Sequence, residues 1–413
     1  MIPKPEILSV ATAAQLVPTT IEKDYALGWL LYGISKHPIL SDWIFKGGTC
    51  LKKCYFETYR FSEDLDFTVP ANAAYTKEEI KRALDEVAAV VYDAVGINLK
   101  AREIEVEESI NKKGLKTFIA RLTYNGPLNV PAYSLQRIKF DITNDEIISD
   151  IPVMRDVFNA YSDAPDPSTK IKCYSINEIL AEKTRAMFER QGRARDIYDV
   201  VNISRNFRPD IDVKKAQNCL KKKFEFKFLP EPSVDLVFSN VNFDLLKANW
   251  ENQLRHQVQV LPTVESFYND LREALSWWID EINLETVLST IQRPVNEQIL
   301  PRIHFPEWQA QSRLGIGRRI NTPSLPGQSA IYLDHIRFAA RNRLCIEITY
   351  HGVKRLVEPY SLRLPQTGNL LLYVYELRRG LAIGGGIKAY KVSEIGNAEI
   401  TQREFIPKYA IEL

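Results

Sequence analysis

The stretch KGGTCLKKCYFETYRFSEDLDF, residues 46–67, decides the fold. A glycine pair, Gly47-Gly48, leaves the apolar segment 43–45 and enters an expected helix. Further on, Asp64 and Asp66 alternate with apolar residues, as in a strand. Glycine has no side chain, so its N–H group can approach a ligand closely. A strand's period of two places both carboxylates on one face. The stretch therefore combines a turn that suits a phosphate with a carboxylate pair that suits a cation.

The two features support each other. Thr49 is expected to cap the helix that follows, whose free N–H groups would favour a phosphate. Two adjacent carboxylates cost free energy unless a cation lies between them, and Mg²⁺ with substrate phosphates is the usual occupant of such oxygen sites. Alone, Gly-Gly is usually a turn and Asp-x-Asp a solvated strand face. Joined at this spacing, they favour nucleotide chemistry with a metal.

The segments 47–49 and 60–67 resemble the AbiEii family of nucleotidyltransferase toxins, which act in type IV toxin–antitoxin systems and include MenT-like toxins. The resemblance implies an α+β fold of the polymerase-β-like nucleotidyltransferase superfamily, with a core sheet and flanking helices. It extends over roughly residues 15–290. The segment 22–25 matches the family's first helix, and three later motifs follow in order.

The second motif is a strand, 137–143, in which Asp141 follows Lys139 at a spacing of two. Its polar residues share one face, so Asp141 is a candidate third carboxylate beside Asp64 and Asp66. It is alternatively the base that activates the acceptor hydroxyl, or an ordinary polar residue of an exposed edge strand.

The third motif is a helix that begins after Ser175 and carries Lys183 among its apolar positions. A lysine on a buried face needs a partner or a site, and the alternative is a lysine that extends to solvent at the rim of the core. The fourth motif is Arg195-Asp196-x-x-Asp199. Its aspartates share a helix face, and capping of that helix is the alternative to a site role.

These motifs predict three overlapping sets of site residues. The expected catalytic residues are Asp64, Asp66, Asp141, Lys183, Asp196 and Asp199. The expected metal ligands are Asp64, Asp66 and Asp141. The expected nucleotide-binding residues are Lys46, Gly47, Gly48, Thr49, Ser62, Lys183 and Arg195. Ser62 is alternatively a plain strand-edge hydroxyl or a modification site.

The composition sets broader limits. The chain has 413 residues with 54 basic and 52 acidic side chains, so its net charge of +2 neither indicates nor excludes nucleic acid. Five cysteines without a Cys-x-x-Cys pair, and no apolar run of membrane length, lead us to expect a cytoplasmic protein without a membrane segment. Cys50 and Cys54 lie one helical turn apart, which fits core packing better than a metal site. The scattered histidines disfavour a zinc or serine hydrolase.

Four segments are expected. Residues 1–210 form the nucleotidyltransferase core, 211–295 a helical extension of the same domain, 296–330 a Pro-rich linker and 331–413 a small SH3-like β-barrel. The last segment is similar to WYL domains, although Leu371-Leu372-Tyr373 replaces the name-giving Trp-Tyr-Leu. Sensing of a ligand and a purely structural or partner-binding role are both open for it.

Together these features predict an enzyme that transfers a nucleoside monophosphate from a nucleoside triphosphate (NTP), with Mg²⁺ or Mn²⁺. The resemblance implies an RNA acceptor such as the tRNA 3′ end, growth arrest or abortive phage infection as the outcome, and a winged-helix antitoxin as partner. One alternative is a nucleotide-binding regulator without transfer activity, which the intact carboxylates disfavour. Another is a protein AMPylating enzyme, which shares the core chemistry.

Overall fold

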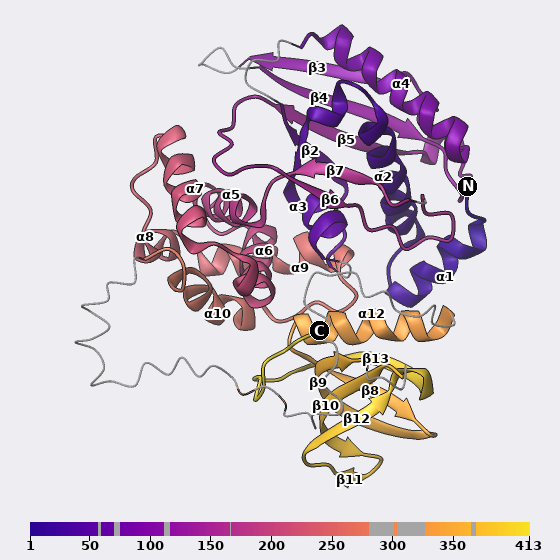
Figure 1. Ribbon diagram of the computed structural model, residues 1–413, viewed down its shortest axis with the longest axis vertical. Coiled ribbons are helices and arrows are strands. Elements are labelled where there is room, and N and C mark those ends of the chain that lie inside the picture. Colours follow the sequence, from indigo (N-terminus) through magenta and orange to yellow (C-terminus); the bar gives the residue numbers. More distant parts are fainter. Residues whose placement is uncertain are drawn as a thin grey trace. The chain divides into compact units, whose positions relative to one another are not determined.

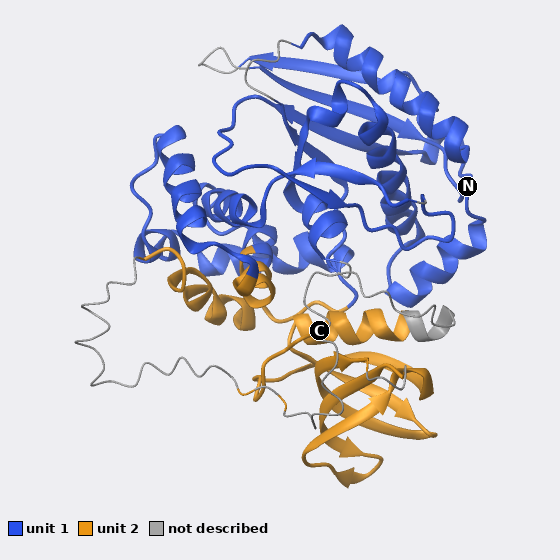
Figure 2. Ribbon diagram, in the orientation of Figure 1, with its two compact units in different colours: residues 1–199, 210–259 blue, residues 200–209, 260–413 orange. Residues whose placement is uncertain are grey.

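The computed structural model divides the chain into two compact units, 1–199 with 210–259 and 200–209 with 260–413 (Figure 2). The structure describes residues 1–56, 59–69, 75–110, 116–165, 167–280, 301, 303, 327–364 and 369–413. Most of the expected linker, 296–330, lies outside these ranges. Among the described residues, no helix is both long and apolar enough to cross a membrane.

A seven-stranded mixed sheet forms the centre of the first unit (Figure 1). Its strands are β1 (Ile44–Lys46), β2 (Asp64–Thr68), β3 (Glu105–Ile110), β4 (Lys116–Tyr124), β5 (Gln136–Thr143), β6 (Val153–Asp156) and β7 (Lys170–Cys173), in the order β3-β4-β5-β2-β1-β7-β6. β2 pairs with β5, and β1 with β7, in parallel, and the other neighbours are antiparallel. The predicted α+β class is confirmed.

Alternation along the central strands separates an apolar face from a polar one. Phe45, Leu65 and Phe140 are fully buried, and the polar residues between them face the other way. Helix α2 (Pro18–Lys36) packs against β5, β7 and α4 (Lys77–Val95), and α4 lies along β3 (Figure 1). Burial of this face against helices supplies most of the stability that fixes the sheet.

Residues 19–22, Thr-Thr-Ile-Glu, have the pattern of a capping box, but no capping box forms at the start of α2 (Pro18–Lys36). The helix begins at Pro18, two residues before the start that this pattern would give, and its cap residue, Val17, makes no side-chain hydrogen bond. Proline suits the first helical position because its missing N–H would have no partner there. Glu22 is buried, and its Oε1 instead accepts the N–H of Leu128 at 2.6 Å.

Besides α2, α4 and the short helix α3 (Gly47–Cys50), the first unit contains further helices in its described part. They are α1 (Lys4–Ala14), α5 (Ile176–Glu189), the first part of α6 (Ala194–Phe207), α7 (Val213–Phe226), α8 (Val234–Ser239) and α9 (Phe243–Leu254). Helix α5 begins after Ser175, as predicted, and the Ser175 hydroxyl caps it by accepting the N–H of Glu178 at 3.2 Å. Helix α5 packs against α7, and α6 continues from the first unit into the second after Asp199.

The second unit contains an antiparallel sheet, helix α10 (Val264–Ser276) and helix α12 (Gly327–Arg341). The strands are β8 (Leu344–Tyr350), β9 (Val353–Arg363), β10 (Leu371–Arg379), β11 (Ala382–Ile383), β12 (Ile387–Lys391) and β13 (Ile395–Glu404). Their order is β11-β10-β9-β8-β13, and β12 also pairs with β10. A two-residue turn joins β8 to β9, with His351 and Gly352 both at positive φ.

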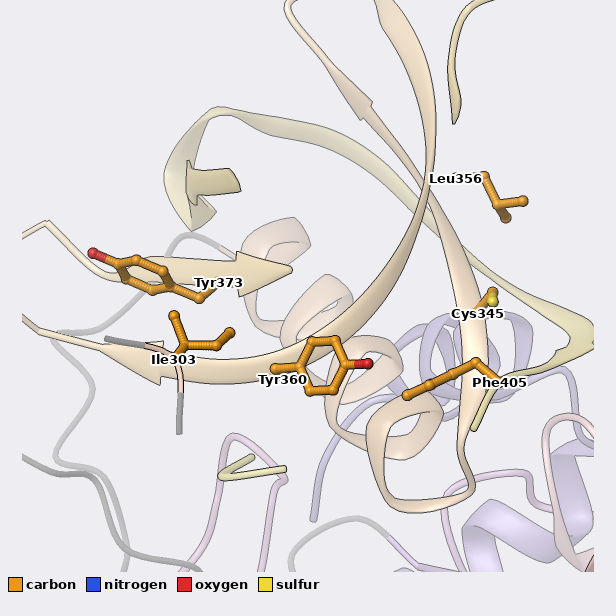
Figure 3. Packing of buried hydrophobic residues seen from close by; sticks show 6 residues of the cluster. All are labelled: Ile303, Cys345, Leu356, Tyr360, Tyr373 and Phe405. Atoms are coloured by element: carbon orange, nitrogen blue, oxygen red, sulfur yellow. The ribbon is translucent and has the colours of Figure 1, made fainter. Parts of the chain in front are cut away.

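A small apolar core holds this second sheet together. Figure 3 shows Ile303, Cys345, Leu356, Tyr360, Tyr373 and Phe405, which form one buried cluster. Helix α12 packs against β8, β9 and β13. The predicted C-terminal β-sheet is therefore present, whereas its likeness to a WYL domain stays a prediction.

Candidate active site

Strand register brings the predicted carboxylates together. In the parallel pair of β2 and β5, Asp64 lies beside Lys139 and Asp66 beside Asp141. In the antiparallel pair of β1 and β2, Lys46 lies beside Asp66. Residues paired across strands share a face, so Lys46, Asp66 and Asp141 form one row across three strands. Asp64 and Lys139 form the next row on the same face.

The electrostatics of this face favour a cation. Burial, the main cause, together with the charges of Asp141 and Asp64 raises the pKa of Asp66 to about 6, although Lys46 and Lys183 oppose the shift. Burial also raises the pKa of Asp64. The Nζ of Lys139 lies 2.8 Å from Oδ2 of Asp141 and offsets part of the negative charge. An oxygen-only set of carboxylates that repel one another fits a hard divalent ion such as Mg²⁺.

The glycine turn lies directly against the carboxylates. Helix α3 (Gly47–Cys50) follows β1, and a π-helical turn, η2 (Leu51–Tyr55), follows α3. Gly47 has a φ of +79°, and a Cβ added there would lie 2.1 Å from Oδ2 of Asp66. A Cβ at Gly48 would lie 2.7 Å from Nη2 of Arg60 and 3.1 Å from Oγ of Ser62. The Gly47 position therefore requires glycine, a side chain at Gly48 would displace the Arg60 guanidinium, and Ser62 lies at the turn.

The predicted cap at Thr49 is wrong. Lys46 occupies the N-cap position of α3 without a side-chain hydrogen bond. Thr49 lies inside the short helix instead, and its hydroxyl donates to the carbonyl oxygen of Asp64. The hydroxyl makes this tertiary hydrogen bond instead of capping the helix, because β2 passes beside the turn. Thr49 thus ties the turn to the strand that carries both aspartates.

Lys183 is held by the two aspartates of the fourth motif. Its Nζ lies 2.8 Å from Oδ2 of Asp199 and 3.5 Å from Oδ1 of Asp196. Although burial opposes ionisation, these carboxylates raise the pKa of Lys183. The side chain is 13% exposed, so it is neither a core lysine without a partner nor one that extends freely into solvent.

Arg60 also binds Asp199, and sequence reasoning missed this residue. Its Nε and Nη2 donate to the two carboxylate oxygens at 2.8 and 2.7 Å, and the hydroxyl of Tyr59 donates at 2.7 Å. Burial works against ionisation, yet Arg60 and Lys183 hold the pKa of Asp199 well below its usual range. Arg60 lies inside the quoted stretch, but nothing local distinguishes it from a surface arginine.

A second contact fixes the segment before β2. Nη1 of Arg60 donates to Oε1 of Gln257 at 3.0 Å, and the N–H of Phe61 donates to the carbonyl oxygen of Gln257 at 2.7 Å. Gln257 lies just after α9 and is buried. No sequence signal marked it, because a lone glutamine in a helical region has no pattern.

Arg195 is a cation without a carboxylate partner among the described residues. Its Nε donates to the carbonyl oxygen of Gln253 at 3.2 Å, and its side chain is half-buried. Burial and the nearby charges of Arg60 and Arg193 lower its pKa. An unmatched guanidinium beside the site suits an anionic ligand.

Lys46, in contrast, has a partner that sequence reasoning missed. Its Nζ lies 3.3 Å from Oε1 of Glu182, which precedes Lys183 on α5. Burial works against this ion pair, yet Glu182 raises the pKa of Lys46. Lys46 therefore contacts the network of α5 while it faces Asp66 across the sheet.

A sheet face with a row of carboxylates is bordered here by lysines and by an arginine that has no carboxylate partner in the described part of the chain. This arrangement can bind a phosphate ester through a cation. The sequence matches the family model described as "Nucleotidyl transferase AbiEii toxin, Type IV TA system" over residues 29–281. The chain belongs to this family of nucleotidyltransferase toxins, and it is an enzyme that uses an NTP.

One solved structure gives a further comparison. MenT4, a nucleotidyltransferase toxin from Mycobacterium tuberculosis H37Rv, is 17% identical, with a TM-score of 0.43 over 70% of this chain and 93% of that chain. No curated protein matches the sequence. The family match ends before the second sheet, so it does not concern the C-terminal segment 331–413.

Proposed function

We propose that the chain transfers a nucleoside monophosphate from an NTP to an RNA 3′ end, that of tRNA in particular, with Mg²⁺ or Mn²⁺. The observation that carries the proposal is the register of β1, β2 and β5, which aligns Lys46, Asp66 and Asp141. Family membership supports the transfer chemistry but does not identify the acceptor. We infer the acceptor from the residues around the site.

Asp64, Asp66 and Asp141 would hold the divalent ion. The pKa of Asp66 is raised to about 6, first by burial and then by the charges of Asp141 and Asp64, and a bound cation would relieve both costs. When bound, the ion supplies stabilisation of the attacking and leaving oxygens in a phosphoryl displacement. Lys139 balances Asp141 when the ion is absent.

The other residues bind and orient the nucleotide. Gly47 and Gly48 place backbone next to Asp66 and Arg60, so phosphates bound at the turn would lie beside the carboxylates. Lys183, which Asp196 and Asp199 hold in place, would neutralise charge that develops on pyrophosphate. We assign Arg195 to the triphosphate because no carboxylate among the described residues pairs with it.

Cations on the same face support a nucleic-acid acceptor. Arg137 and Lys139 precede Asp141 at a spacing of two on β5, and Arg121 of β4 lies beside Lys139. Their side chains are 44%, 38% and 28% exposed. Such a row beside the carboxylates would meet the phosphate backbone of an RNA end.

The biological setting follows from the family. We propose growth arrest or abortive phage infection as the outcome, action in the cytoplasm on tRNA, and a winged-helix antitoxin as the partner that restrains it. A regulator that only binds nucleotide has less support, because three carboxylates and their cations are all in place.

The test uses purified protein, total RNA and each α-³²P-labelled NTP, with Mg²⁺, Mn²⁺ or a chelator. A double variant, Asp64→Ala with Asp66→Ala, removes the carboxylate pair. Asp42→Ala is the matched control, since that side chain is 68% exposed and pairs with Lys172. We expect label in RNA that needs metal and disappears only in the double variant. Label in protein would instead support AMPylation, and retained NTP binding without any label would refute transfer.

A further inference from the structure

Three cysteines from two distant segments meet inside the first unit. Cys50 ends α3, Cys54 lies in η2 and Cys173 ends β7. Their sulfur atoms all lie within 4.8 Å of one another, and each residue is at most 1% exposed. Among the described residues no other set of three potential metal ligands is as compact, the three site aspartates included.

Two features of the fold bring these sulfurs together. The parallel pairing of β1 and β7 places Cys173 beside Phe45, at the end of the strand that leads into the glycine turn. The chain then turns at Gly47, so that Cys50 and Cys54 return toward β7. The second of these lies in a π-helical turn, a rare form that recurs at functional sites.

Positive charge lies next to the cluster. The Nε of Arg155 donates to the carbonyl oxygen of Cys54 at 3.1 Å, and its guanidinium lies 4.5 Å from the ring centre of Tyr55. The hydroxyl of Tyr55 lies 4.0 Å from Sγ of Cys173. Three buried thiolates with one monovalent or divalent cation keep a net negative charge, which a neighbouring guanidinium offsets.

We propose that Cys50, Cys54 and Cys173 form a trigonal thiolate site for one soft d¹⁰ metal ion, Zn²⁺ or Cu⁺. Thiolates select such ions over Mg²⁺. At a metal–sulfur distance of about 2.3 Å, sulfurs up to 4.8 Å apart need to move inward by only about 0.5 Å each. Cys173 shares the apolar face of Phe45, so this ion is not the one expected at the carboxylates.

A metal ion bound by these three cysteines would stabilise the glycine turn that leads into α3. It would join α3 and η2 to β7, and Thr49, next to Cys50, makes the hydrogen bond to the Asp64 carbonyl oxygen. The bound ion would thereby hold the turn against β2. We expect it to raise the melting temperature of the protein while the carboxylate site remains the place of transfer.

The experiment measures metal per chain on the reduced 413-residue protein. The protein is incubated with Zn²⁺ or with chelated Cu⁺, desalted and analysed by mass spectrometry of the elements, and Co²⁺ serves as a spectroscopic substitute for Zn²⁺. We expect one equivalent of metal, a cobalt–thiolate charge-transfer band with the intensity of three thiolates, and a higher melting temperature. The Zn²⁺ and Cu⁺ arms show which ion the site prefers.

Matched variants separate this cluster from other thiols. Cys50→Ser and Cys173→Ser should lose the metal, whereas Cys219→Ser and Cys345→Ser, also at buried cysteines, should keep it. If a cluster variant fails to fold, the cobalt–thiolate spectrum of the wild-type protein still tests the proposal. No bound metal on five free thiols would overturn the proposal, as would metal retained in Cys173→Ser. A disulfide within the cluster in place of metal would overturn it as well.

The carboxylate site needs its own control in the same experiment. The double variant Asp64→Ala with Asp66→Ala should still bind one soft metal ion, because its thiols are intact. Loss of the metal in that variant would place the ion at the carboxylates and overturn the proposal. RNA labelling by the proposed transferase is a separate readout, so its failure leaves this test unaffected.

Discussion

Replacing Asp66 by asparagine removes a charge that the folded protein holds half-buried among other carboxylates. The pKa of this carboxyl rises from 3.8 to about 6 on folding. At about 1.4 kcal/mol for each pKa unit, the ionised form costs the fold about 3 kcal/mol. Asparagine has nearly the same shape and carries no charge. Without metal, Asp66→Asn should therefore be more stable than the wild type by up to about 3 kcal/mol.

The raised pKa of Asp66 also fixes the direction in which the free energy of unfolding changes with pH. Between pH 3.8 and about 6, the folded state binds a proton at Asp66 that the unfolded state has lost, so the free energy of unfolding falls as pH rises through this window. This loss of stability is complete above about pH 6 and absent below about pH 3.8. The advantage of Asp66→Asn should be about 3 kcal/mol near pH 7.5 and about 1 kcal/mol near pH 4.5.

The measurement is urea unfolding of both proteins with a chelator at the two pH values. Asp42→Asn, at an exposed position, is the control and should match the wild type throughout. Saturating Mg²⁺ should reduce the difference, because only the wild type has the full set of ligands. An unchanged stability for Asp66→Asn at the higher pH, or a gain that does not vary with pH, would refute the reasoning.

Three further substitutions test other parts of the site. Gly47→Ala should lower transfer at least ~100-fold, because its Cβ would lie 2.1 Å from a site carboxylate oxygen. Gly96→Ala has nearly the same φ, +78°, and open space, so it should lose only about 1 kcal/mol and keep its kcat; equal losses of activity would contradict the close approach. Asp199→Asn should destabilise the fold by about 3–5 kcal/mol in urea unfolding, since Arg60 remains buried, and a neutral effect would argue against that pairing. Arg195→Gln should raise the KM for NTP ~10-fold with an unchanged melting temperature, and an unchanged KM would remove this residue from the nucleotide site.

The local sequence pattern alone was enough to predict the carboxylate pair and the candidate residues near it. Asp64 and Asp66 share a face because strand residues alternate, which is a property of the backbone itself. The same reasoning marked Asp141, and the buried face of α5 marked Lys183. These predictions required no knowledge of the partner residues. A charged residue in an apolar pattern is costly to bury, so the pattern itself implies that a partner exists.

Tertiary structure decided which residues meet. Arg60 and Asp199 lie 139 positions apart, and Cys173 joins Cys50 only because β7 pairs with β1. Thr49 likewise gives its hydroxyl to a carbonyl of β2 instead of capping its own helix. A side chain's partner depends on how the chain closes on itself, and sequence spacing carries no signal for a contact between distant segments. The sequence determined the chemical groups of the candidate site, and the packing of strands and helices determined their pairing.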